Sequence, residues 1–278
     1  MTELNTTQSG IAWQKTVVSE HAQSDSVREE LTPDDFWRPV AHKFVPPKKG
    51  ESAPDDTVQM LAELITPEET VLDVGAGGGR IAIPLAEYSS HITAVEPSEG
   101  MREQLVGTAE AWEVQNLSVV ASTWEEAQVE PHDLVVCAHV VYTVTAIESF
   151  IRKLSLSARK SVALISFARP ATAIYLPLWS RVHGEKRIEL PTLPQIESLL
   201  SEMGIEYRET LLEAWISCPF KNREQAFIEC QARLFVSPDS EKSKVLNDLL
   251  GESLIEVEGG FRLKWAEPDR PRIISWDV

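Results

Sequence analysis

The sequence has few cysteines and no long apolar run. Its three cysteines, Cys137, Cys218 and Cys230, are odd in number and widely spaced among 278 residues, which favours reduced core thiols over a disulfide framework or a metal cluster. No run approaches the roughly 20 apolar residues of a spanning helix, and the first residues lack the basic and apolar regions of a signal peptide. These absences predict a cytoplasmic protein with no membrane partner and no metal site.

Basic residues are also scarce. The chain has 26 Lys and Arg residues against 43 Asp and Glu residues, and its formal net charge is −17. The resulting field repels phosphate backbones and anionic membranes. We therefore expect no nucleic-acid partner.

The chain divides into three parts by composition. Residues 1–30 are rich in Thr, Ser, Gln and Glu, which predicts a mobile N-terminal segment. Residues 31–56 begin with a helix-start signal and a helical spacing of Phe36, Val40 and Phe44, and they end in a linker rich in Pro and Lys, so we expect a helix followed by that linker. The remainder, 57–278, is expected to form one domain.

In that remainder, short apolar strands alternate with helical stretches. The expected strands are 70–74, 91–96, 117–122, 132–140 and 161–168. This alternation predicts an α/β fold, a doubly wound and mostly parallel seven-stranded sheet with an antiparallel C-terminal edge and with inserted helices near the C-terminus. We expect a cofactor-binding core at 57–168, and a substrate cap with the C-terminal strands at 169–278.

A glycine loop follows the first of these strands. The sequence from Asp73 reads DVGAGGGR, so glycines stand at 75, 77, 78 and 79. In a dinucleotide fingerprint the third glycine would stand where Arg80 is, and that glycine allows close packing of the helix around a pyrophosphate. The acid two residues before the first glycine further separates this loop from that fingerprint.

The acid, the glycines and Glu96 at the end of the next strand together resemble the class I S-adenosylmethionine-dependent methyltransferases over about residues 57–168. The resemblance implies S-adenosylmethionine as cofactor, whose cationic sulfonium suits nearby acids. It implies that Glu96 accepts hydrogen bonds from the two ribose hydroxyls and that Thr123 and Trp124 contact adenine. The other cofactor-binding residues that it implies are Asp73, Gly75, Ala76, Gly77, Gly79, Arg80, Pro97, Met101, Ala138 and His139.

The sequence also departs from this family near the third strand. Members often carry an Asp near the position of Ser122 or Thr123 to hold the adenine amine. In this sequence, hydroxyl or backbone groups must hold the adenine amine instead.

The acceptor is expected near residues 137–144, after the fourth strand. No NPPY, DPPY or Pro-Cys motif stands there, so the motifs of nucleic-acid methyltransferases are missing. His139 is a candidate general base, because its ordinary pKa is about 6.5, or it orders the loop. Tyr142 lines the pocket or packs in the core. Aromatic residues outside the core are expected either to line a small-molecule pocket or to pack in the interior; they are Trp37, Phe44, Tyr175 and Trp179.

The leading hypothesis is methyl transfer from S-adenosylmethionine to oxygen or nitrogen of a small molecule. An NAD(P)-dependent reductase is the first alternative, disfavoured by Arg80 and by the lack of a Tyr-x-x-x-Lys pair. A non-catalytic S-adenosylmethionine-binding module is the second. Radical chemistry is disfavoured because no CxxxCxxC motif is present. None of these motifs specifies the acceptor or the oligomeric state.

Overall fold

A seven-stranded sheet forms the centre of the computed structural model, which describes residues 6–29, 35–51, 55–214 and 220–278. The strand order is β3-β2-β1-β4-β5-β9-β6. The strands are β1 (Thr70–Val74), β2 (His91–Val95), β3 (Leu117–Val120), β4 (His132–Ala138), β5 (Ala158–Ser166), β6 (Arg208–Leu211) and β9 (Arg272–Asp277). Strands β1 to β5 pair in parallel, and β9 is antiparallel to β5 and β6. The predicted mostly parallel sheet is confirmed, with β9 second from the edge and β6 outermost.

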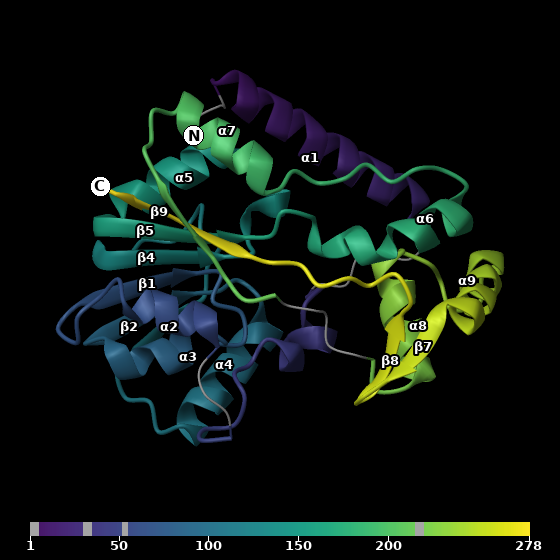
Figure 1. The fold of residues 1–278 in the computed structure, drawn as a ribbon, viewed down its shortest axis with the longest axis horizontal. Coiled ribbons are helices and arrows are strands. Elements are labelled where there is room, and N and C mark those ends of the chain that lie inside the picture. Colours follow the sequence, from purple (N-terminus) through teal and green to yellow (C-terminus); the bar gives the residue numbers. More distant parts are fainter. Residues whose placement is uncertain (1–5, 30–34, 52–54, 215–219) are drawn as a thin grey trace.

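Helices cover both faces of this sheet (Figure 1). One face carries α2 (Asp56–Ala62), α3 (Ala82–Leu85) with the 3-10 turn η2 (Ala86–Tyr88), and α4 (Glu99–Ala111); the other carries α5 (Ile147–Leu156), α7 (Leu193–Glu202) and α1 (Gln8–Val27). Neighbouring residues of β1 point to opposite faces, as strand geometry requires. Val71 packs in a cluster with Leu61 of α2, whereas Leu72 packs in a cluster with Ile151 of α5.

A second, smaller layer lies beyond the carboxyl ends of the strands, and we call it the cap. It consists of the 3-10 helix η4 (Ala171–Tyr175), α6 (Leu176–His183), α8 (Arg223–Arg233), α9 (Glu241–Ser253) and the hairpin of β7 (Leu254–Val257) and β8 (Gly260–Leu263). Its interior is a separate apolar cluster around Trp179. The helices inserted before the last strand agree with the sequence-based prediction.

Helix α1 corrects the expectation that residues 1–30 are mobile, although residues 1–5 and 30 lie outside the described ranges. The helix has 20 residues, and the Thr7 side chain caps it by accepting a hydrogen bond from the Gly10 N–H. Composition misled because only a few apolar side chains anchor the helix. Trp13 and Val17, one turn apart, are 2% and 0% exposed. None of the helices in the described ranges combines the length and the apolar character needed to cross a membrane.

The same helix joins the core to the cap. At its start, the Glu148 carboxylate of α5 accepts hydrogen bonds from the backbone N–H groups of Thr6 and Thr7, at 2.7 and 2.6 Å. Toward its end, the Glu20 carboxylate pairs at 2.8 Å with Arg187, which lies on the segment returning from the cap. Both side chains of this pair are 5% exposed. The 20-residue helix, about 30 Å long, therefore bridges the two layers, as Figure 1 shows.

Residues 35–45, which we call the cover segment, also differ from their prediction. The helix expected over 31–44 is reduced to the six-residue 3-10 helix η1 (Arg38–Lys43), which has a proline in its first turn; residues 31–34 lie outside the described ranges. Short 3-10 turns of this kind serve as connectors. The segment leads from the end of α1 to the glycine loop.

We predict that Arg187→Met lowers the free energy of unfolding by about 3 kcal/mol, because it leaves the Glu20 carboxylate buried without its partner. Urea denaturation measures this loss. The matched control is Arg208→Met, since the Arg208–Asp277 pair is 64% and 68% exposed, and its loss should stay below about 1 kcal/mol. Equal effects of the two substitutions would contradict the role given to the buried pair.

Candidate cofactor and acceptor site

The glycine loop lies between β1 and α3, at the carboxyl edge of the sheet. Gly75, Gly77 and Gly79 have φ angles of +74°, +56° and +87°, a region that side chains disfavour. A Cβ at Gly75 would come within 2.4 Å of Val140, and one at Gly79 within 2.6 Å of Ile83. Around Gly77 the nearest atoms are 3.8 Å from such a Cβ. The loop is therefore packed tightly at both ends and less tightly at Gly77.

Glu96, directly after β2, connects this loop to the start of α4. Its Oε2 accepts a hydrogen bond from the Gly77 N–H and its Oε1 accepts one from the Ser98 N–H, both at 2.8 Å. Burial raises the pKa of this carboxyl, against the effect of these two hydrogen bonds. Each carboxylate oxygen can accept more than one hydrogen bond. Glu96 can thus receive hydroxyl groups of a ligand while it holds the loop.

Asp73 is a buried acid at the end of β1 and is 2% exposed. Its Oδ2 has no hydrogen-bond partner among the described residues. Burial, together with the charge of Glu96, raises the pKa of Asp73 to about 7, although Arg80 opposes the shift. The Arg80 guanidinium is itself paired with Asp55, at 2.6 Å. A buried acid with an unpartnered oxygen is suited to a cationic group of a ligand, so the site fits a sulfonium cofactor with an amino group.

The cover segment is attached to both parts of this site. The Asp35 carboxylate accepts hydrogen bonds from the Ser98 hydroxyl and the Gly100 N–H, both at 2.8 Å. The Phe44 carbonyl oxygen accepts one from the Arg80 N–H at 3.2 Å. These contacts were missed in the sequence, because no motif distinguishes Asp35 from the other acids of the chain.

The backbone after β4 presents His139 in an unusual conformation. His139 has φ of +59°, and its N–H donates to the Ile165 carbonyl at 2.9 Å. Its Nδ1 lies 3.2 Å from the Tyr142 hydroxyl, which accepts hydrogen bonds from the Phe167 N–H and the Ser166 hydroxyl. Because the Tyr142 oxygen accepts these two hydrogen bonds, we assign its own proton to the bond with Nδ1 and the proton of the neutral imidazole to Nε2.

Burial also sets the charge of both side chains. Burial and the nearby charge of Arg80 hold the pKa of His139 well below its ordinary value, and the imidazole packs on the Phe167 ring with centroids 4.5 Å apart. Burial raises the pKa of Tyr142 to about 12. Both are neutral near pH 7, and a protonated Nε2 cannot accept a proton. This arrangement favours the reading in which His139 orders the loop over its role as general base.

Two of the expected contact residues lie in the interior instead. Trp124 is 4% exposed, and its Nε1 donates to the Phe150 carbonyl at 3.4 Å, so it has no free face for adenine. Trp179 has no exposed surface and packs on His183 inside the cap. The placement of Trp124 corrects its expected contact with adenine, and that of Trp179 agrees with the interior packing that was the alternative to a pocket position. Trp124 lies in the turn after β3 and Trp179 lies within α6, and in both places only the packing reveals which way the side chain points.

Two other expected residues, Met101 and Phe44, lie against the loop. Met101 is 4% exposed, and its sulfur lies 3.8 Å from the Cβ position of Gly77. Trp37 is 39% exposed and contacts Phe44 edge to face, with centroids 5.7 Å apart. The remaining predicted residues are Ala76 and Tyr175, both buried, Ala138, which is partly buried, and Pro97 and Thr123, both exposed.

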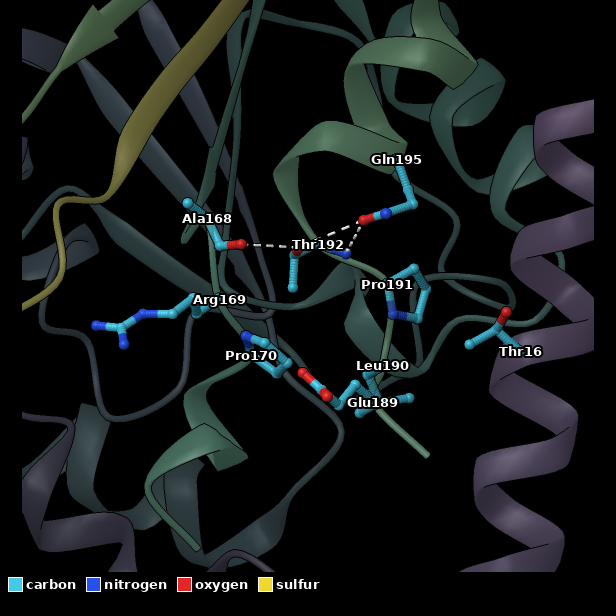
Figure 2. A pocket seen from close by; sticks show the side chains of 9 residues that line it. All are labelled: Thr16, Ala168, Arg169, Pro170, Glu189, Leu190, Pro191, Thr192 and Gln195. Carbon is cyan, nitrogen blue, oxygen red and sulfur yellow. Dashed lines mark hydrogen bonds between the residues drawn. The ribbon is translucent and has the colours of Figure 1, made fainter. Parts of the chain in front are cut away.

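A pocket of about 240 Å³ lies where the chain leaves the core after β5 and returns before α7 (Figure 2). Sequence reasoning missed it, since distant segments form it. Ala168 and Thr192 close one side, with the Thr192 hydroxyl donating to the Ala168 carbonyl at 3.0 Å. Figure 2 shows Arg169 directed away from Gln195 and from Thr16 of α1. The pocket adjoins the His139 region, because Ala168 directly follows Phe167.

Comparison with known proteins agrees with this geometry. Residues 71–160 match a family model described as a methyltransferase domain. A ubiquinone biosynthesis O-methyltransferase of Rickettsia akari is 26% identical over 64% of this chain and 74% of its own length. Another protein of that name, from Rickettsia felis, is 35% identical over 30% of this chain and 34% of its own length.

Solved structures show the same fold. The YcgJ protein of Bacillus subtilis superposes with a TM-score of 0.54 at 14% identity, over 80% of this chain and 97% of its own. An S-adenosylmethionine-dependent methyltransferase of Geobacter sulfurreducens, solved with S-adenosylhomocysteine, gives a TM-score of 0.52 at 14% identity, over 87% of this chain and 97% of its own. The match to the methyltransferase-domain model over residues 71–160, together with the strand order, the glycine loop and the two acids beside it, identifies this part of the chain as a class I S-adenosylmethionine-dependent methyltransferase domain.

Proposed function

We propose that this methyltransferase acts on an oxygen or nitrogen atom of a small molecule, bound between the carboxyl ends of β4 and β5 and the cap. The observation that carries the proposal is the pair of buried acids, Asp73 and Glu96, on either side of the glycine loop. One has an unpartnered oxygen and the other has hydrogen-bonding capacity left over. This pair matches a ligand that carries both a cation and vicinal hydroxyls.

Each acid has a distinct part in holding the cofactor. Glu96 would accept hydrogen bonds from the two ribose hydroxyls, and Asp73 would hold the cationic amino group of the methionine portion. Gly75, Gly77 and Gly79 provide close approach of the backbone, and Thr123 lies on the adenine side. When bound, the cofactor supplies an electrophilic methyl group on its sulfonium.

The chain's own contribution to the transfer is mainly positioning. Methyl transfer is an in-line displacement, so the protein must align the acceptor atom with the methyl carbon and sulfur. His139 and Tyr142, both neutral, fix the loop after β4 through the hydrogen bond from the tyrosine hydroxyl to Nδ1. The Nε2–H of His139 remains available to orient a polar group of the acceptor.

The net charge of the chain and the names of its relatives both support a small-molecule acceptor. The net charge of −17 opposes nucleic-acid binding, and the curated relatives include proteins named for ubiquinone biosynthesis. We place the protein in the cytoplasm, because Cys137 and Cys230 are free and buried, as in a reducing compartment.

Transfer of label from S-[methyl-³H]adenosylmethionine tests this function. The protein is incubated with a cell extract that has been separated into small molecules, nucleic acid and protein. We expect label in the small-molecule fraction, with Glu96→Ala as the inactive control. Label confined to nucleic acid or protein, or no transfer to any fraction, would refute the proposal.

We predict that Asp73→Ala and Glu96→Ala each weaken the affinity for S-adenosylhomocysteine at least tenfold, about 1.4 kcal/mol. Calorimetry measures the affinity. Trp124→Phe, which changes a buried side chain outside the site, should leave it unchanged. If both acid variants bind as tightly as the wild type, the assignment of the site is wrong.

The affinity for S-adenosylhomocysteine should also fall with decreasing pH. The pKa of Asp73 in the free protein is raised to about 7, and a cationic ligand favours the ionised form. Protonation of Asp73 therefore competes with ligand binding below pH 7, so the affinity should fall by about tenfold per pH unit. Titrations at pH 6, 7 and 8 measure the trend, and Asp73→Asn should abolish it. A trend that persists in Asp73→Asn would assign it to another group.

A further inference from the structure

We propose that Arg233 is a specificity-determining residue that selects a planar acceptor carrying a carboxylate, an inference that rests on the proposed function. Arg233 is the last residue of α8 and is partly buried. Its guanidinium lies over the rings of Phe36 and Trp37, at 5.3 and 5.4 Å from their centroids. It also lies beside the Tyr175 hydroxyl. The cover segment, η4 and α8 thus converge on one cation.

This cation has no carboxylate partner in the described part of the chain. The contrast with Lys43 is direct. Lys43 contacts the same helix one turn earlier, where its Nζ pairs with Glu229 at 2.5 Å. The charge of Lys43 is therefore neutralised locally, whereas that of Arg233 is not. Contact with ring faces uses the positive charge of a guanidinium but leaves available those N–H donors that do not face the Tyr175 hydroxyl.

Aromatic contacts connect Arg233 to the cofactor loop. Trp37 contacts Phe44 at 5.7 Å between centroids, and Phe44 lies against the loop, with its Cβ 3.8 Å from the Cβ position of Gly77. A row of two rings thus runs from the guanidinium to the loop that holds the methyl donor. An acceptor along this row has flat apolar surfaces beside it and a cation at its far end.

In a protein of negative net charge, an unpaired cation of this kind points to an anionic ligand. A protein with a net charge of −17 repels anionic substrates at long range, so an anionic acceptor needs a local positive site. Arginine presents paired N–H donors that match the two oxygens of a carboxylate. The rings of Phe36 and Trp37 hold the guanidinium in place for such a contact, since it loses little further freedom on binding.

Binding of benzoate and benzamide to the protein saturated with S-adenosylhomocysteine tests the proposal. The two probes have nearly the same shape and differ in charge. We expect the wild type to bind benzoate at least tenfold more tightly than benzamide, as measured by ligand-observed NMR titration. Arg233→Met should remove this preference, a loss of about 1.4 kcal/mol for benzoate, while the affinities for benzamide and S-adenosylhomocysteine stay the same.

Arg223→Met is the matched control. Arg223 begins the same helix, and its guanidinium lies over the Phe261 ring at 4.9 Å, so this variant should retain the preference for benzoate. Wild-type protein with no preference for benzoate, or Arg233→Met that keeps it, overturns the proposal. An equal loss of affinity for benzoate, benzamide and S-adenosylhomocysteine in Arg233→Met also overturns the proposal, because it would show a purely structural role for Arg233. A wild type that fails to bind S-adenosylhomocysteine would instead overturn the cofactor assignment.

Discussion

The carboxylate of Glu96 is the point on which the site depends. Parallel pairing of β1 and β2 places Val74 opposite Val95, so the glycine loop and Glu96 emerge at the same edge of the sheet. Two backbone N–H groups, from Gly77 in the loop and Ser98 at the start of α4, then meet on one carboxylate. A second buried acid, Asp73, lies nearby, and both carboxyl groups have raised pKa values. The charge of Glu96 contributes to the raised pKa of Asp73. A cationic ligand relieves that repulsion.

The layers outside the sheet are organised around this edge. Helix α1 begins on the core at Glu148 and reaches the cap at Arg187. The cover segment then returns to the loop, where Asp35 and the Phe44 carbonyl bind α4 and Arg80. Residues 6–29 and 35–45 therefore contact the core, the cap and the cofactor loop in turn. Their position links the orientation of the cap to the loop that holds the methyl donor.

Much of the core could be predicted because its signals are local. Strand β1 and the glycine loop are contiguous in sequence, and alternation of strands and helices implies parallel pairing. Helix α1 was missed because its burial depends on Trp13 and Val17 meeting partners more than a hundred residues away, such as the Val144 carbonyl that accepts from Trp13. For the same reason, composition and spacing could not show that Trp124 and Trp179 point inward.

The sequence by itself determined the donor side of this protein. Asp73, the glycines and Glu96 are held at their places by one strand–loop–helix unit and the strand that follows it, so their relative positions follow from short-range geometry. Only the tertiary structure decided the acceptor side that we propose. There, Trp37, Tyr175 and Arg233 come from three separate parts of the chain, and their meeting depends on how the cover segment and cap pack on the core. Sequence periodicity cannot predict such contacts, because the position of each of these side chains depends on packing partners that are distant in sequence.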